Sequence, residues 1–320
     1  MFIRGPFANC WICAFRQLRL ALIVALALVA TAQEKPKNDY VGSTPCKTCH
    51  PDVWLKFYKN PHFGSIASTK EAPENTGCEG CHGPGGAHVK AHGGKATIKA
   101  FSQLAPKQVL DTCLRCHSAT LSRANIRHSA HTLEGVACTS CHSIHKSTAP
   151  RSLLAKTEPE LCYGCHTDVR AQFSMPFKHR VNEGFMACSD CHNPHGTFSP
   201  TWRMASRPRM VDQAFSNEEA CLKCHSEKRG PFVFEHPPVR IEGCEACHNP
   251  HGSTNARLLK RPVVFTVCLE CHNGAGTFGL HGTGDPNPSA RHNMADPRYQ
   301  NCTNCHVRIH GSNSDALFLR

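Results

Sequence analysis

The pentapeptide Cys-x-x-Cys-His occurs ten times in this chain of 320 residues. Two thiols at this spacing can form thioethers with the two vinyl groups of one porphyrin, and the adjoining histidine can then bind the iron from one side. The sequence therefore predicts ten covalently bound haem c groups. The copies begin at Cys46, Cys78, Cys113, Cys138, Cys162, Cys188, Cys221, Cys244, Cys268 and Cys302.

Each copy supplies two predicted thioether cysteines and one predicted proximal ligand. The second cysteine of each motif is Cys49, Cys81, Cys116, Cys141, Cys165, Cys191, Cys224, Cys247, Cys271 or Cys305. The proximal histidines are His50, His82, His117, His142, His166, His192, His225, His248, His272 and His306.

Zinc sites and disulfides are the alternative uses of paired cysteines. Structural zinc sites do not require a histidine directly after each second cysteine. The chain has 23 histidines, too few for ten such placements to arise by chance. An eleventh pair, Cys10 and Cys13, is followed by Ala14 instead, and it lies where no haem is expected. The pattern therefore favours haem.

Thirteen further histidines remain for the opposite face of each iron, and they recur in register with the motifs. Five candidates lie between paired motifs: His62; His128 or His131; His179; His236; and His281 or His292. Five follow the second motif of a pair: His88 or His92; His145; His195; His251; and His310. Methionine, the main rival ligand, does not recur in this register. We therefore expect two histidines on every iron, which leaves no open position for a substrate.

The spacing also predicts how the units are joined. His145, His195 and His251 each follow a motif histidine by three residues, too close to reach over the same porphyrin. We expect them to bind the haem of a neighbouring unit. Five two-haem units are predicted, at about 46–95, 113–150, 162–200, 221–256 and 268–313, within one decahaem domain over 33–320.

The expected fold class is a multihaem cytochrome that is mostly irregular, with short α-helices, little β structure and an elongated array of haems. Glycine and proline are frequent, and periodic apolar segments are few. A short helix is expected from Pro51 to Asn60. With so little polypeptide for each haem, the porphyrins must supply the hydrophobic core.

Residues 1–32 resemble a secretory signal, with Arg4, Arg16 and Arg19 ahead of an apolar run and small residues before a cleavage point at Ala32. An uncleaved anchor is the alternative, although the run is short for a membrane span. We therefore expect an exported protein.

The formal net charge of +12 does not indicate nucleic-acid binding. Ten haems bring twenty propionates, which outweigh this excess of basic residues. We expect much of the lysine and arginine to neutralise propionates.

Three stretches together resemble the periplasmic decahaem cytochromes of the MtrA/DmsE/PioA type. They are PFKHRVNEGFMACSDCHNPHG at 176–196, CEGCHGPGGAH at 78–88 and HVRIHGSN at 306–313. The resemblance extends over the whole mature chain, and it favours His88, His131 and His292 over their neighbours as ligands.

The resemblance implies a location in the periplasm, in association with the outer membrane and inside a β-barrel porin. It also implies a periplasmic or inner-membrane cytochrome as donor, and an extracellular multihaem cytochrome or terminal reductase as acceptor. The apolar tail Ala316–Leu319 is a candidate docking segment or a packed terminus.

Three functions are compatible with the motifs. The first is an electron carrier that conducts between the periplasm and the cell exterior. The second is a soluble periplasmic electron shuttle with the same chemistry. The third is an oxidoreductase of the multihaem nitrite or hydroxylamine type, which needs a haem with a vacant face. All ten motifs end in histidine and the candidate distal histidines exceed demand. The sequence therefore favours a carrier with no catalytic residues.

Overall fold

The computed structural model describes residues 39–67, 70–119, 123–147, 152–196, 220–272, 292–293 and 295–319. The predicted signal at 1–32, with Cys10 and Cys13, lies outside the described residues, and so does His281.

The described residues form short helices joined by turns. The α-helices are α2 (Thr44–Cys49), α3 (Pro51–Phe57), α4 (Gly64–Ala67), α5 (Gly77–His82), α6 (Gly86–Lys90), α7 (Pro106–His117), α8 (Ala130–Leu133), α9 (Cys138–Cys141), α10 (Glu158–Cys162), α11 (Thr167–Gln172), α12 (Pro237–Ile241) and α13 (Val264–Leu269). The 3-10 turns are Pro61–Phe63, Pro73–Asn75, Lys95–Thr97, Phe101–Gln103, Ile126–His128, Cys188–Asp190, Ala220–Lys223, Ser226–Lys228, Cys244–Ala246, Ala256–Leu258, Pro297–Tyr299 and Cys302–Asn304.

Proline sets where several of these helices begin. Pro51, Pro106 and Pro237 each occupy the first position of a helix, where the missing N–H costs no hydrogen bond. The expected helix after the first motif is confirmed as α3, which ends at Phe57, three residues earlier than expected. The longest helix, α7, has 12 residues. Helices this short gain little stability of their own and depend on what they pack against.

No strand occurs in the described parts of the chain. Backbone pairing there is limited to four isolated antiparallel bridges, His142 with Leu154, Phe177 with Ser253, Phe234 with Ser312, and His248 with Leu259. The expectation of short helices and little β structure is therefore confirmed.

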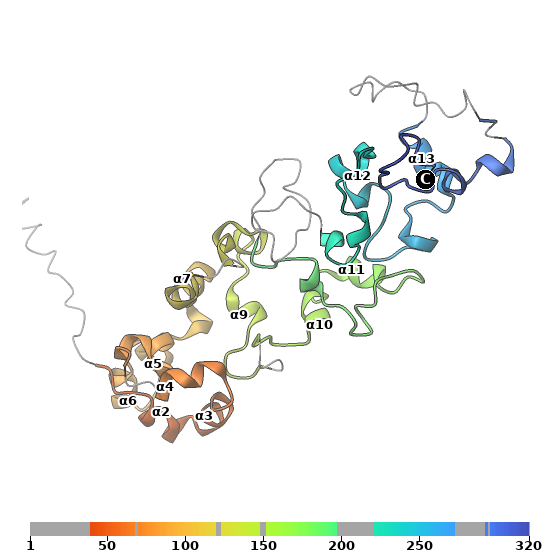
Figure 1. The fold of residues 1–320 in the computed structure, drawn as a ribbon. Helices are drawn as coiled ribbons and strands as arrows, with labels where there is room; N and C mark the ends of the chain where they lie inside the picture. Colours follow the sequence, from red (N-terminus) through yellow and green to blue (C-terminus); the bar gives the residue numbers. More distant parts are fainter. Residues whose placement is uncertain are drawn as a thin grey trace, which may run out of the picture.

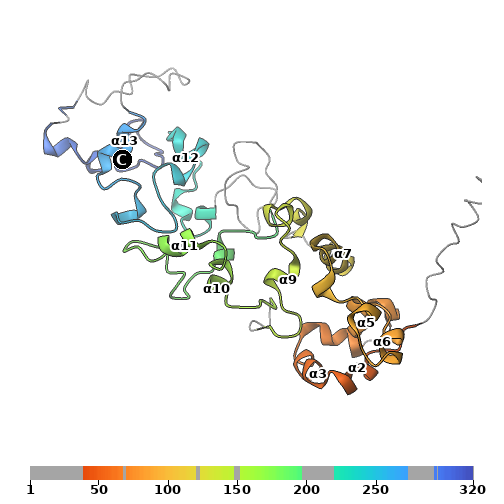
Figure 2. The same ribbon diagram turned by 180° about the vertical axis from the view of Figure 1, so that it is seen from behind.

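The units follow one another along an extended path. Helices α2 to α6 lie at one end of the molecule, α9 to α11 in the middle, and α12 and α13 toward the other end (Figure 1). The view from behind gives the same order (Figure 2). The elongated shape expected from the repeat is the observed one.

Apolar side chains alone do not fill the interior. Among the described residues the buried apolar side chains are Phe57, Val109, Leu110, Leu153, Phe173, Val181, Leu222 and Val267, and none is below 2% exposed. Large apolar side chains such as Leu133 and Phe185 line the central cavity while 72% and 74% exposed. A polypeptide this poor in core needs bound cofactors to cover its apolar surface.

This deficit generates a prediction for the polypeptide without haem. Chain produced in a host that lacks cytochrome c maturation should be unfolded, because its buried apolar area is too small to offset conformational entropy. Far-ultraviolet circular dichroism and limited proteolysis measure this, with the haem-loaded chain as control. A protease-resistant apo chain would contradict the proposed cofactor core.

Candidate functional site: facing histidines along one cavity

Each Cys-x-x-Cys-His motif folds as a single helical turn. The backbone N–H of the motif histidine donates to the carbonyl of the first cysteine, as in His50 to Cys46 at 2.9 Å and His306 to Cys302 at 2.9 Å. A turn of this kind places residues i, i+3 and i+4 on one face. Both cysteines and the histidine are thereby presented together, as attachment to one porphyrin requires.

Nine motif histidines face a second histidine at a nearly constant distance. Their ring centroids lie 5.7–6.4 Å apart. The pairs are His50–His88 at 6.3 Å, His117–His62 at 5.7 Å, His82–His145 at 5.9 Å, His166–His131 at 6.2 Å, His142–His195 at 6.1 Å, His192–His251 at 5.8 Å, His272–His236 at 6.2 Å, His248–His310 at 6.4 Å and His306–His292 at 6.4 Å.

This distance fits one iron between two imidazoles. An imidazole nitrogen binds a first-row metal at about 2 Å, so two such rings on opposite sides of an iron have centres a little over ~6 Å apart. The Nε2 atoms of His62 and His117 face each other at 3.4 Å, close to the ~4 Å that two such bonds span. The donor set therefore fits haem iron with histidine on both faces.

For His88 against His92 and for His131 against His128, the structure distinguishes between the neighbouring candidates that the sequence left open. It pairs His88 and His131 with motif histidines, whereas His92 and His128 line the same cavity outside these pairs. His292 lies against His306. These are the three histidines that the resemblance favours.

The remaining two predicted ligands, His179 and His225, belong to successive units. Both line the cavity that most of the other pairs share.

The pairs are exchanged between successive units. His145 follows the second unit's motifs but faces His82 of the first unit, while His62 of the first unit faces His117 of the second. The same exchange links His142 with His195 and His166 with His131. We call the contact between two successive units, where histidines of one unit face motif histidines of the other, a junction. At the two ends, His88 and His292 instead face motif histidines of their own units.

Paired motifs also meet through their first cysteines. Cys46 lies next to Cys78, and Cys113 lies in the same way next to Cys138, Cys162 next to Cys188 and Cys268 next to Cys302. Porphyrins attached to these cysteines would lie next to each other within a unit. Contacts within units therefore alternate with ligand exchange between units.

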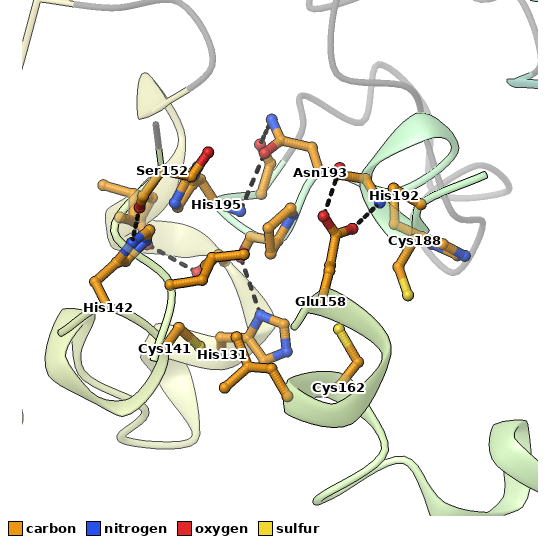
Figure 3. A pocket seen from close by; sticks show the side chains of 18 of the residues that line it. His131, Cys141, His142, Ser152, Glu158, Cys162, Cys188, His192, Asn193 and His195 are labelled. Atoms are coloured by element: carbon orange, nitrogen blue, oxygen red, sulfur yellow. Dashed lines mark hydrogen bonds between the residues drawn. The ribbon is translucent and has the colours of Figure 1, made fainter. Parts of the chain in front are cut away.

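One continuous cavity connects most of these groups. It runs from the first motif to Thr303 and Asn304 of the tenth and has a volume of about 4220 Å³. Ordinary small-molecule sites measure roughly 300–1,000 Å³, so the cavity is large enough for several cofactors side by side. Figure 3 shows its middle, where His131, His142 and His195 lie around the cavity near Cys141.

Four motif histidines, each from the second motif of a unit, are oriented by backbone carbonyls from a segment that returns after that motif. A carbonyl only accepts, so the Nδ1 atom facing it carries the proton and Nε2 keeps a lone pair for a metal. The contacts are His82 Nδ1 to Lys99 O at 2.9 Å, His142 to Ser152 O at 2.8 Å, His248 to Arg257 O at 2.8 Å and His306 to Leu317 O at 2.6 Å. The bond from His142 to Ser152 is visible in Figure 3.

These return segments were missed by the sequence reasoning. In three of them an apolar residue adopts a left-handed backbone: Leu153 at φ 53°, Leu258 at φ 60° and Phe318 at φ 60°. The repeated signal was an apolar pair 10 to 13 residues after a motif histidine, as in Leu153-Leu154 and Leu258-Leu259. The tail Ala316–Leu319 is one of these segments, and its Phe318 ring packs on His236 at 5.6 Å.

Distal histidines are oriented across the junctions. His131 Nδ1 lies 3.0 Å from the carbonyl of Pro194, and His179 Nδ1 lies 2.6 Å from that of Pro250. His236 has the same relation to the carbonyl of Ile309. In each case the acceptor directly precedes a predicted distal histidine of the next unit, so one predicted ligand is hydrogen-bonded to the residue before another.

Close backbone approach at the junctions explains the glycine after these histidines. A Cβ on Gly252 would lie 2.0 Å from the carbonyl oxygen of Gln172, whose side chain also meets His251 Nδ1 at 3.0 Å. A Cβ on Gly311 would lie 2.1 Å from the ring of Phe232. The recurring His-Gly dipeptide therefore lets one unit dock on the previous one.

Glu79, inside the second motif, is a further residue that sequence reasoning missed. It is 3% exposed, and its carboxylate accepts the backbone N–H groups of Val41, Gly42 and Gly85 at 2.7–3.0 Å. These bonds satisfy the buried charge. Glu79 thereby fixes the segment before the first motif against the loop after the second.

Burial favours the neutral form of several predicted distal imidazoles. Desolvation lowers the pKa of His195, His236 and His310 to about 4. Desolvation also lowers the pKa of His62 and His145. Neutral imidazole is the form that binds a metal.

Basic side chains outnumber acidic ones along the cavity. The basic group is Lys95, Arg115, Arg123, Lys146, Lys223, Lys228, Arg229, Arg240 and Arg257, and the acidic group is Glu79, Glu158, Asp190, Glu235 and Glu245. This excess of positive charge suits a cavity that takes up cofactors carrying carboxylates.

Comparison with known families recognises the repeated motifs by sequence. A family model described as the doubled CXXCH motif matches residues 130–171, 179–230 and 236–277, and the cytochrome c554 and c-prime model matches 87–143. The multiheme cytochrome MtrA of Shewanella baltica is 36% identical over 85% of this chain and 79% of its own length. The chain belongs to the MtrA family of multihaem c-type cytochromes. Like other MtrA-type cytochromes it binds haem c and is an electron carrier rather than an enzyme.

Two more distant relatives share parts of the pattern. The high-molecular-weight cytochrome c of Nitratidesulfovibrio vulgaris is 25% identical over 83% of this chain, which spans 46% of that protein. The cytochrome c-type protein NrfB of Escherichia coli is 30% identical over 39% of this chain and 65% of its own. In the part of the chain that the structure describes, no helix is long and apolar enough to cross a membrane.

The pair His142–His195 generates a prediction. The substitution His195→Ala should leave one haem with a single histidine, because the facing ring 6.1 Å away is removed. Electron paramagnetic resonance of the oxidised protein should gain one high-spin ferric signal per molecule. His92→Ala is the matched control, and we expect it to leave every haem low-spin. An unchanged spectrum in His195→Ala would remove this residue from the ligand set.

Proposed function

We propose that this MtrA-type cytochrome holds ten haem c groups, each between two histidines, and conducts electrons along them. The proposed attachment residues are the twenty cysteines of the ten motifs, and the proposed proximal ligands are the ten motif histidines. The proposed distal ligands are His62, His88, His131, His145, His179, His195, His236, His251, His292 and His310. The row of facing imidazoles carries this proposal, because nine pairs share one metal-binding distance along an elongated molecule.

We assign His179 to the haem of His225. The other three junctions support this assignment, since each exchanges one distal histidine in both directions. His192 already faces His251 of the next unit, so the reverse exchange at that junction joins His179 with His225. The bond from His179 to Pro250 O repeats the contact between His131 and Pro194 O.

The array favours conduction over catalysis at every iron. Two histidines saturate the axial positions, so substrates have no free site. Ten similar sites in contact allow an electron to move by successive short steps. The alternation of touching cysteines and exchanged ligands supplies those contacts along the molecule.

We further propose that residues 1–32 direct export and that the mature domain, 33–320, works at the outer membrane inside a β-barrel porin. A periplasmic or inner-membrane cytochrome is the proposed donor, and an extracellular multihaem cytochrome or terminal reductase is the proposed acceptor. The MtrA relative and the elongated shape support this arrangement. A freely diffusing periplasmic shuttle is the alternative.

The number of haems can be measured directly. Intact-protein mass spectrometry of the mature, haem-loaded chain should show ten added haem masses, one for each motif. Cys188→Ala combined with Cys191→Ala should reduce the number by one. Eight or fewer haems on the unsubstituted chain would contradict the proposal.

The location can be tested by co-purification. Affinity capture of the tagged protein from detergent-solubilised outer membranes should recover a β-barrel protein in a 1:1 ratio. Reconstituted in vesicles, the pair should pass electrons from an internal reduced dye to an external acceptor, and vesicles with the barrel alone should not. Recovery only from the soluble fraction would favour the shuttle.

A further inference from the structure

The first junction is built differently from the other three. At those, the Nδ1 atom of one distal histidine meets the carbonyl that precedes another, as His131 meets Pro194 O. At the first junction the side chain of Asn60 lies between the distal histidine and the carbonyl group. The corresponding residues there are His62, of the first unit, and Ile144, which directly precedes His145.

Asn60 contacts both partners. Its Oδ1 accepts the backbone N–H of His62 at 2.9 Å and lies 3.0 Å from His62 Nδ1. Its Nδ2 donates to the carbonyl oxygen of Ile144. One half-buried amide therefore joins the ring that faces His117 to the loop that carries the ring facing His82.

We infer that Asn60 is a positioning residue that sets the reduction potential of the haem of His117 and steadies the distal ligand of the haem of His82. The inference rests on the proposed ligation by His62 and His145. At the other three junctions the acceptor between the two distal histidines is a backbone carbonyl, which no substitution removes. At the first junction it is a side chain, so the sequence can adjust the strength of the bond.

The physical basis is the basicity of the ligand. A proton on Nδ1 that is held by a stronger acceptor makes Nε2 a stronger donor to iron, and this stabilises the ferric state. A carboxylate accepts more strongly than an amide oxygen. Loss of the acceptor has the reverse effect, since Nδ1 then bonds only to water.

Two variants separate this role from a structural one. Asn60→Asp should move one of the ten redox components to lower potential, by about tenfold in its reduction equilibrium constant, or about 59 mV for one electron. Asn60→Ala should move the same component to higher potential. Spectroelectrochemical titration of the haem-loaded protein measures both. A loosened junction alone would shift the two variants in the same direction, and that result would overturn the inference.

Two further variants complete the test. Lys59→Gln changes the net charge by the same amount as Asn60→Asp, one residue away on an exposed side chain, and should give no comparable shift. His62→Ala should give one high-spin haem. If it does and the Asn60 variants do not shift oppositely, only the role of Asn60 is overturned. If His62→Ala leaves all haems low-spin, the ligand assignment fails, and the role of Asn60 fails with it.

Discussion

Two imidazole rings held with their centroids 5.7–6.4 Å apart are the constraint on which the rest of the structure depends. Nine such pairs occur along the described chain, the closest at 5.7 Å and the widest at 6.4 Å. Keeping a pair at this distance requires both backbones to be fixed and both rings to be oriented. The short helical turns, the return segments and the glycine contacts at the junctions all serve that purpose. Helices of four to twelve residues suffice because they only position ligands.

The proposed exchange of ligands connects the successive units of the elongated molecule into one cooperative structure. A unit such as that of His117 and His142 faces histidines from both neighbours, His62 from the preceding unit and His195 from the following one, which are its proposed ligands. A chain with few buried apolar side chains gains its long-range connections in this way. The proposed iron atoms join histidines that are distant in sequence, such as His82 and His145, as disulfides do in other small-cored proteins.

Hydrogen bonds to Nδ1 form a second layer around the facing rings. Backbone carbonyls supply most of these acceptors, at Lys99, Ser152, Arg257 and Leu317 for motif histidines and at Pro194 and Pro250 for distal ones. A carbonyl acceptor fixes the tautomer without adding charge. Asn60 and Gln172 are the described places where a side-chain amide takes this part. A family of electron carriers can thus keep histidine as the ligand at every haem and vary the reduction potential through the group that accepts the Nδ1 proton.

The ten motifs, the short helices and the set of candidate distal histidines followed from the sequence alone, because covalent haem attachment dictates a local spacing that any fold must keep. His195 illustrates the limit. Its position three residues after His192 excluded that haem, but its partner, His142, lies fifty-three residues earlier in the sequence and emerged only from the packing of units. The return segment at Leu153 was likewise invisible until its left-handed turn placed Ser152 against His142. Attachment is decided by neighbours in sequence, whereas pairing is decided by which backbones approach closely enough for two rings to share one metal, and only the tertiary structure holds that information.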